Sequence, residues 1–238
     1  MTIWKTLSCL LAIGFWMNSG VHGLENAGKL RSEINAERVL FLGNSITRHG
    51  PAPKIGWIDD WGMAASALEK DFVHQVASGI AAMIGKDPEK KITNIADFER
   101  NLATYDIATK LKAELDFKPT LVIIAIGENV AALKTDDAKA QFKASFARLL
   151  ATVKSAGQPA LVVRGCFWTD KTKDEIMQQA CAAAGGTFVD IGALGKVEAN
   201  FARSERKWDH DGVAAHPGDK GMAAIAAAIL KALKADVK

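Results

Sequence analysis

A serine lies where a short apolar run gives way to turn-forming residues. The stretch FLGNSIT, residues 41–47, places Gly43 and Asn44 directly before Ser45. Residues of these types form turns, so Ser45 either caps the segment that follows or presents its hydroxyl as a nucleophile. A serine hydroxyl attacks a carbonyl only when a neighbouring base takes its proton, so a nucleophilic role also requires a histidine.

His216 is the best candidate for that base. It lies in WDHDGVAAHPGDKGM, residues 208–222, with acidic residues shortly before it. A carboxylate bonded to the far ring nitrogen would hold the imidazole in the tautomer that accepts the serine proton. Asp211 is the candidate for this carboxylate, and Asp209 remains an alternative.

An asparagine follows a second apolar run. Asn129 lies in IGENV, residues 126–130, at the end of the run TLVIIAIG, residues 120–127. An amide N–H at this place would reach an oxyanion formed on a substrate attached to Ser45. A polar loop residue is common when taken alone, but a nucleophile, a base and an oxyanion donor together indicate acyl-transfer chemistry.

Apolar runs alternate with segments of helical period from residue 35 onward. Strands are predicted at 38–43, 91–95, 120–127, 160–165 and 187–192, and helices at 61–85, 99–115, 135–155, 171–184 and 218–235. Continuous apolar strands are typical of a parallel sheet covered on both faces, which predicts an α/β fold with three layers. Ligands bind beyond the carboxyl ends of such strands, where Ser45 and Asn129 are expected.

The three stretches FLGNSIT, IGEN and DGVAAHPGDKGM together resemble motif blocks of the SGNH (GDSL-type) hydrolase superfamily. The resemblance implies that Ser45 is the nucleophile, His216 the general base and Asn129 an oxyanion donor. It also implies a flavodoxin-like, five-stranded parallel sheet between two helical layers. The implied reaction is hydrolysis of an ester through an acyl-enzyme on Ser45, without a metal or organic cofactor.

The chain departs from the family's pattern in three places. The interval between Asp211 and His216 is longer than usual, which is why Asp209 stays an alternative. The second block reads NIADFER, residues 94–100, so Glu99 stands at a position usually held by glycine; its backbone N–H is the predicted second oxyanion donor beside that of Ser45. Asn44 replaces a commoner aspartate, and Val130 replaces an aspartate that often follows the oxyanion asparagine.

Aromatic and charged residues near the predicted site suggest the substrate. The candidates for substrate binding are Arg48, His49, Trp57, Trp61, Trp168 and Trp208. Indole rings at an active-site edge stack on sugars, although most tryptophans pack in cores. Exported members of the superfamily are frequently carbohydrate O-acetylesterases, so an O-acetylated carbohydrate is the preferred prediction. The alternatives are a lipid-directed esterase, lysophospholipase or thioesterase, and a carbohydrate-binding protein that has lost the chemistry.

The composition and the N-terminal segment predict the number of domains and the cellular location. The 238 residues are 49% hydrophobic and 24% charged, which predicts one globular domain over 24–238. Residues 1–23 have the layout of a secretory signal peptide, so we expect a secreted or periplasmic protein without stable membrane insertion after cleavage. The formal charge of +3 is dispersed and gives no support to a nucleic-acid partner. Cys166 and Cys181 lie in apolar surroundings and are expected to be buried free thiols.

Overall fold

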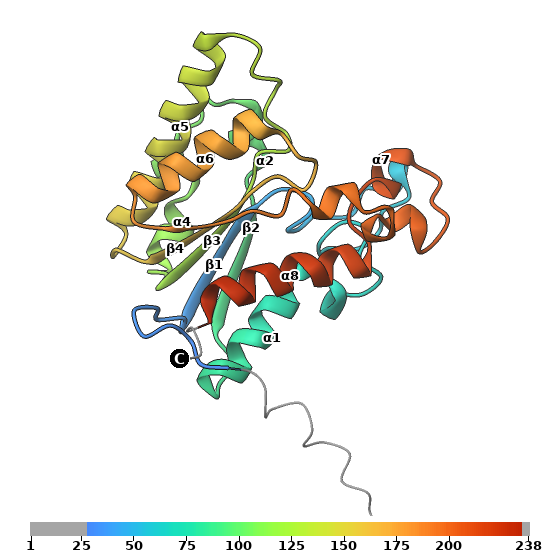
Figure 1. Ribbon diagram of the computed structural model, residues 1–238, viewed down its shortest axis with the longest axis horizontal. Helices are drawn as coiled ribbons and strands as arrows, with labels where there is room; N and C mark the ends of the chain where they lie inside the picture. The colour runs from blue at the N-terminus through green and yellow to red at the C-terminus, as the bar shows by residue number, and fades with distance from the viewer. Residues whose placement is uncertain (1–27, 235–238) are drawn as a thin grey trace, which may run out of the picture.

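The computed structural model describes residues 28–234, which contain a five-stranded sheet (Figure 1). Every strand pair is parallel, and the strand order is β2-β1-β3-β4-β5, which confirms the predicted fold class. The strands are β1 (Arg38–Gly43), β2 (Glu89–Asn94), β3 (Leu121–Ala125), β4 (Ala160–Arg164) and β5 (Thr187–Val189). The predicted signal peptide, residues 1–23, lies outside the described residues.

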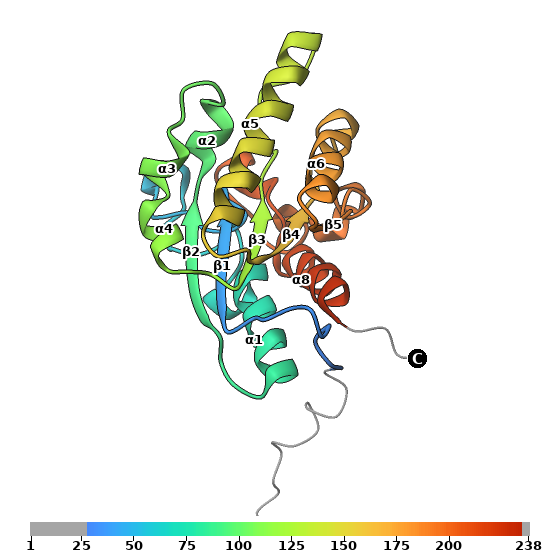
Figure 2. The same ribbon diagram turned by 90° about the vertical axis from the view of Figure 1, so that its left-hand side faces the viewer.

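Two layers of helices cover the sheet (Figures 1 and 2). One face packs against α1 (Phe72–Ile84) and α8 (Asp219–Leu233). The other packs against α2 (Ala96–Arg100), α3 (Ile107–Lys110), α4 (Lys112–Asp116), α5 (Asp136–Ser155) and α6 (Lys171–Ala183). A further short helix, α7 (Asp211–Ala214), precedes α8. Within residues 28–234, no helix combines the length and the apolar character needed to cross a bilayer.

Alternation along β1 explains how one apolar run serves both layers. Val39 and Phe41 belong to the core under α1 and α8, whereas Leu40 and Leu42 belong to the core under α5 and α6. All four are fully buried. Because successive side chains of a strand point to opposite faces, a strand covered on both sides must be apolar throughout. Helices therefore pack on both faces of the sheet, and the carboxyl ends of its strands are held in place by both cores.

The predicted helix 61–85 begins eleven residues late, at Phe72. Asp71 caps α1, since its Oδ1 accepts a hydrogen bond from the His74 backbone N–H at 2.7 Å. Its other oxygen accepts from the Gly62 N–H at 3.2 Å, which ties the preceding loop to the cap. Ala64 in that loop has a φ of 74°, a conformation that an α-helix does not contain. Residues 61–71 are therefore an ordered loop with one short 3-10 helix, Leu68–Lys70, rather than the first turns of α1.

The predicted helix 99–115 is divided into three short helices, α2, α3 and α4. Residues 101–106 between α2 and α3 are not helical. Asp106 then starts α3 as its N-cap, with Oδ1 accepting from the Thr109 N–H at 3.2 Å. The helical period predicts the individual short helices correctly. The side chain of Asp106 accepts a hydrogen bond from a backbone N–H, however, and this favours the start of a new helix over one continuous helix.

Candidate active site

The structure brings Ser45 and His216 together at the carboxyl edge of the sheet. Ser45 follows β1, and His216 lies between α7 and α8. The Ser45 Oγ and the His216 Nε2 are 2.8 Å apart, a hydrogen-bonding distance. Two residues 171 positions apart in the sequence thus lie within hydrogen-bonding distance, as the predicted nucleophile and base require.

The turn that carries Ser45 is closed by its own backbone and by Asn44. The Asn44 carbonyl accepts from the Thr47 N–H at 2.9 Å and from the Arg48 N–H at 3.0 Å. The Asn44 Oδ1 accepts from the Ile46 N–H at 3.2 Å, as in an Asx-turn. A Cβ on Gly43 would lie 1.8 Å from the Thr47 Oγ1, so only glycine permits this tight packing. The turn therefore presents the Ser45 hydroxyl in a fixed direction.

A backbone carbonyl orients His216. The His216 Nδ1 lies 2.6 Å from the Gly212 carbonyl oxygen, which can only accept a hydrogen bond. The Nδ1 must therefore carry the proton, and the Nε2 is left with the lone pair that a serine hydroxyl needs. Gly212 lies in α7, four residues before His216, so one helical turn brings the carbonyl to the ring.

The predicted contact between Asp211 and His216 is absent. Among residues 28–234, neither Asp211 nor the alternative Asp209 forms a hydrogen bond to the imidazole. Asp211 is the first residue of α7, and its own carbonyl accepts from the Ala215 N–H at 2.9 Å. The place that an acidic partner would take at Nδ1 belongs to the Gly212 carbonyl. This is a correction to the sequence analysis.

Burial keeps His216 neutral. Its exposed fraction is 8%, and removal from water disfavours the imidazolium. This burial lowers the pKa of His216 to about 4, although the hydrogen bond to Gly212 acts in the opposite direction. At neutral pH the ring is consequently an unprotonated base.

The Trp168 ring packs against the His216 imidazole. The two rings are perpendicular, with their centroids 5.2 Å apart. The Trp168 indole N–H donates to the Ala215 carbonyl at 3.1 Å, which fixes the indole to the segment that carries the histidine. With an exposed fraction of 36%, Trp168 also retains open surface beside the Ser45–His216 pair.

A polar cavity of about 240 Å³ opens at Ser45. It is lined by Ser45, His49, Asn94, Ala96, Asp97, Arg100 and Asn129. The predicted nucleophile and the predicted oxyanion asparagine therefore share one cavity. His49 lines the same space, with its Nδ1 2.6 Å from the Gly50 carbonyl oxygen.

Two charged neighbours fix the amide of Asn129. Its Nδ2 donates to the Glu99 Oε2 at 2.9 Å, and its Oδ1 accepts from the Arg100 Nη2 at 3.2 Å. A carboxylate only accepts and a guanidinium only donates, so the amide has one orientation. Since Nδ2 carries two hydrogens, one N–H remains for another acceptor.

Glu99 lies behind Asn129 rather than beside Ser45. It is 1% exposed and is not part of the cavity lining, to which Ala96 and Asp97 of the same helix contribute instead. Its Oε1 accepts from the backbone N–H groups of Gly127 at 2.6 Å and Asn129 at 3.0 Å. Burial, followed by the nearby Glu128 carboxylate, raises the pKa of Glu99. The structure thus gives Glu99 a supporting position, and the predicted backbone donor at Glu99 lies outside the cavity.

The other predicted substrate-binding residues are dispersed. Trp57 is 1% exposed and donates its indole N–H to the His49 carbonyl at 2.9 Å, so its ring is closed to a sugar. Trp208 is half-buried and packs against a small apolar cluster that includes Trp57 and Val213. Trp61 and Arg48 line a separate cavity of about 910 Å³, and Arg48 pairs there with Asp60. Of the four tryptophans predicted to bind substrate, Trp168 is the one that packs against His216.

The sequence analysis missed Gly212, Arg100 and Glu128 as members of the site. Gly212 acts through its backbone carbonyl, which every residue type has, so its residue type gave no indication of this role. The spacing of four residues to His216, one helical turn, could have indicated the contact. Arg100 directly follows Glu99 in the second motif block, and Glu128 precedes Asn129 in the third. Both were therefore inside stretches that had already been singled out.

The two cysteines of the described residues are not part of this site. Cys166 and Cys181 are buried free thiols, as predicted. Burial raises the pKa of Cys181 to about 11 and raises that of Cys166 further, so both are protonated at neutral pH. In the described part of the chain, no group of three or more His, Cys, Asp or Glu side chains is arranged to hold a metal ion.

Comparison with known proteins gives a family match and several structural similarities. Residues 41–224 match the model of the GDSL-like lipase/acylhydrolase family. A solved structure described as a GDSL-like lipase from Bacteroides uniformis is 12% identical, with a TM-score of 0.49, over 83% of this chain and 95% of that chain. A family two carbohydrate esterase from Cellvibrio japonicus is 14% identical, with a TM-score of 0.48, over 83% of this chain and 60% of that chain.

An acetyl xylan esterase from the rumen bacterium Butyrivibrio proteoclasticus is 11% identical, with a TM-score of 0.48, over 83% of this chain and 63% of that chain. The present chain thus spans about three-fifths of the length of these two esterases. None of the curated proteins matches the chain.

The pKa of His216 predicts an acidic limit of activity. A base must be unprotonated, so kcat/KM should be constant above the pKa of about 4 and fall as the pH drops through it. The measurement is a pH profile of kcat/KM for an aryl ester, with ¹⁵N NMR of the ring nitrogens to assign the titration to His216. A half-maximal point near 6.5, the ordinary value for histidine, would contradict the effect of burial.

The position of Asp211 predicts that its carboxylate is dispensable. We expect Asp211→Asn to change kcat by less than about threefold, whereas removing the orienting carboxylate of a serine triad costs about 10⁴-fold. Steady-state kinetics of this variant and of the matched Asp209→Asn decide the matter. A loss of about 100-fold or more in either variant would restore that aspartate as the partner of His216.

Proposed function

The chain belongs to the GDSL-like lipase/acylhydrolase family and is a carboxylic ester hydrolase, and we propose that it removes O-acetyl groups from carbohydrate through an acyl-enzyme on Ser45. The observation that carries this proposal is the contact of 2.8 Å between the Ser45 Oγ and the His216 Nε2. The hydrogen bond from the His216 Nδ1 to the Gly212 carbonyl supports it, because it leaves Nε2 free to take the serine proton.

The reaction begins when Ser45 attacks the ester carbonyl while His216 removes the hydroxyl proton. The tetrahedral oxyanion accepts hydrogen bonds from the free N–H of the Asn129 amide and from the Ser45 backbone N–H. His216 then returns the proton to the leaving alcohol, and the acyl group stays on Ser45. A water molecule, deprotonated by His216, attacks the acyl-enzyme and releases the acid.

The base works without a carboxylate behind it. The Gly212 carbonyl accepts the Nδ1–H and stabilises the imidazolium with its dipole rather than with a full charge. Burial disfavours the imidazolium and lowers the pKa of His216 to about 4, and the hydrogen bond to Gly212 offsets this only in part.

Two features support a small acyl group on a carbohydrate. The cavity at Ser45 has about 240 Å³ and is lined mainly by polar side chains, which suits acetate better than a long chain. Trp168 presents a partly exposed indole next to His216, and an indole face fits the apolar face of a sugar ring. Export to the periplasm or beyond, proposed from residues 1–23, would bring the enzyme to polysaccharides.

A neighbouring cavity favours a second candidate, a lipid-directed esterase or thioesterase. This cavity of about 480 Å³ shares Arg100 and Asn129 with the Ser45 cavity. Its walls include Leu102, Val130 and Leu133. A longer acyl chain would enter it if the Arg100 side chain turned toward solvent.

Replacing the nucleophile tests the catalytic assignment. With 4-nitrophenyl acetate as substrate, we expect Ser45→Ala to lower kcat by at least about 1,000-fold, since the acyl-enzyme cannot form. Ser155→Ala, at an exposed serine on α5, serves as the matched control and should retain full activity. Turnover by Ser45→Ala at the wild-type rate would refute the assignment.

Varying the acyl chain separates the two candidates. We expect kcat/KM to be highest for the acetyl ester and to fall from butanoyl to octanoyl, because the small polar cavity rejects long chains. Release of acetate from acetylated xylo-oligosaccharides, followed enzymatically, should accompany this preference. A kcat/KM that rises with chain length, without release of acetate from the oligosaccharides, would favour the lipid-directed alternative.

A further inference from the structure

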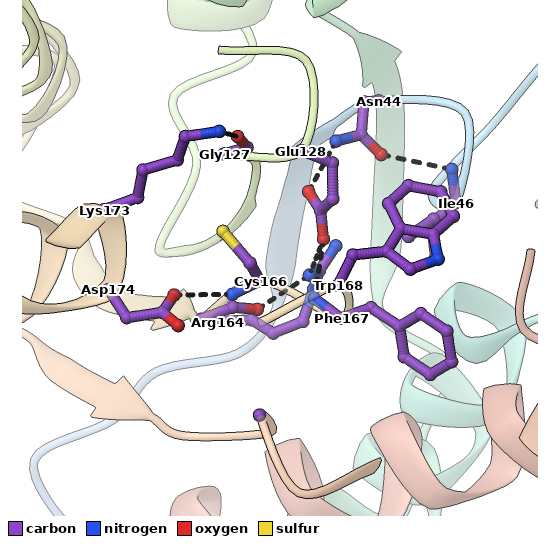
Figure 3. Close-up of polar contacts among 12 residues, drawn as sticks. Asn44, Ile46, Gly127, Glu128, Arg164, Cys166, Phe167, Trp168, Lys173 and Asp174 are labelled. Carbon is purple, nitrogen blue, oxygen red and sulfur yellow. Dashed lines mark hydrogen bonds and ion pairs between the residues drawn. The ribbon is translucent and has the colours of Figure 1, made fainter. Parts of the chain in front are cut away.

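Glu128 is a buried carboxylate that connects three segments at the edge of the sheet (Figure 3). It follows β3, and its side chain is 1% exposed. The Oε2 accepts from the Asn44 Nδ2 at 2.7 Å. The Oε1 accepts from the Phe167 backbone N–H at 2.9 Å and from the Arg164 Nη1. Glu128 does not line the Ser45 cavity, so it has no contact with substrate there.

One oxygen of Glu128 controls the turn of the nucleophile. Asn44 directly precedes Ser45; its Nδ2 donates to Glu128 and, at 3.4 Å, to the Glu99 Oε1, and its Oδ1 accepts from the Ile46 N–H. Because the carboxylate only accepts, it requires the Nδ2 end of the Asn44 amide to face it. The Oδ1 end is thereby directed to Ile46, where it closes the turn around Ser45.

The other oxygen of Glu128 holds the loop that supports the base. Phe167 donates to it, and the next residue is Trp168. The Trp168 ring packs against His216, and its N–H is bonded to the Ala215 carbonyl. A shift of the loop at Phe167 would therefore move the indole that borders the imidazole.

Arg164 keeps the Glu128 carboxyl ionised and acceptor-only. Its side chain is fully buried and forms an ion pair with Glu128. Burial opposes ionisation, but the adjacent guanidinium prevails and holds the pKa of Glu128 below its ordinary value. The Arg164 Nη1 also donates to the Gly165 carbonyl at 2.7 Å, so the cation is anchored at the end of β4.

We propose that Glu128 is a positioning residue for catalysis, whose two oxygens set the Ser45–His216 geometry by fixing the nucleophile turn and the Trp168 loop to one point. This inference rests on the proposed function, in which Ser45 attacks and His216 is the base. It also explains Asn44, since an aspartate at this position would place a second acceptor-only group against Glu128.

Exchanging the amide and carboxylate groups of positions 44 and 128 tests the contact between Asn44 and Glu128. Glu128→Gln turns an amide N–H₂ toward the donors of Asn44 or of Phe167 and Arg164, so one contact must break. Asn44→Asp sets two acceptors against each other. We expect each variant to lower kcat by about 10- to 100-fold with KM changed by less than about threefold, the loss that a misplaced reacting group produces.

The double variant Asn44→Asp/Glu128→Gln should recover part of this loss, because the carboxylate introduced at position 44 still faces the Glu99 Oε1, which lies 3.4 Å from the Asn44 Nδ2. The amide introduced at position 128 then donates its N–H₂ to the carboxylate introduced at position 44, and its carbonyl still accepts from Phe167. The introduced carboxylate in turn still accepts from the Ile46 N–H. We expect the kcat of the double variant to exceed that of either single variant by at least about threefold.

The matched control is Glu114→Gln. It removes a carboxylate that is also buried, with an exposed fraction of 9%, and that accepts from the Thr93 Oγ1 at 3.1 Å. Because Glu114 has no contact with the nucleophile turn or the Trp168 loop, this variant should leave kcat unchanged.

Wild-type kcat in Glu128→Gln, or a double variant no faster than the single variants, would overturn the proposal. If Glu128→Gln does not fold, Asn44→Ala cuts the same link from the other end; it should show the same fall in kcat, and a wild-type kcat would again overturn the proposal. The failure of the proposed function has a different signature, because Ser45→Ala would then remain active. A loss of activity in Ser45→Ala alone separates an essential serine from an unneeded Glu128.

Discussion

The hydrogen bond between the His216 Nδ1 and the Gly212 carbonyl is the constraint on which the site depends. An imidazole has two tautomers, and only the one with its proton on Nδ1 can accept the hydroxyl proton of Ser45. A backbone carbonyl selects this tautomer without bringing a charge into the site. It also requires α7 to form, because the helical turn delivers the carbonyl to the ring. The geometry of a short helix therefore replaces an acidic side chain.

Charge is buried one layer below the cavity, where it is compensated. Glu99 and Glu128 are both withdrawn from water, and each is surrounded by donors rather than by solvent. Leaving such a carboxylate unpaired would be costly, which is why backbone N–H groups, amides and Arg164 converge on the pair. The oxygens of both carboxyl groups accept hydrogen bonds, whereas the buried Nε and Nη2 of Arg164 have no partner among the described residues. These carboxyl groups contact Asn129 and Asn44 directly, so a displacement of either would reach the turn of Ser45 or the amide of Asn129.

The sequence predicted the parts of the fold and site that depend on residue type and periodicity. Continuous apolar runs predicted most of the strands, and the polar residues at the ends of two of them, Ser45 and Asn129, line one cavity. The acidic partner of His216 was predicted wrongly because a backbone carbonyl has no signature in residue type. Trp57 shows a second limit, since burial depends on the path of a loop and not on the residue. The loop 61–71 shows a third, because its Asp71 cap is bonded to Gly62, a contact that periodicity does not encode.

Three of the departures from the family's motifs have a partner in space. Asn44 stands where aspartate is commoner, and it donates to Glu128, a carboxylate that an aspartate would repel. Glu99 stands where glycine is usual, and it accepts from the amide of Asn129. The longer interval before His216 places Gly212 one helical turn from the ring. A departure that is compensated by a partner in space keeps the geometry of the site, so these substitutions argue for a working enzyme rather than for a fold that has lost its chemistry.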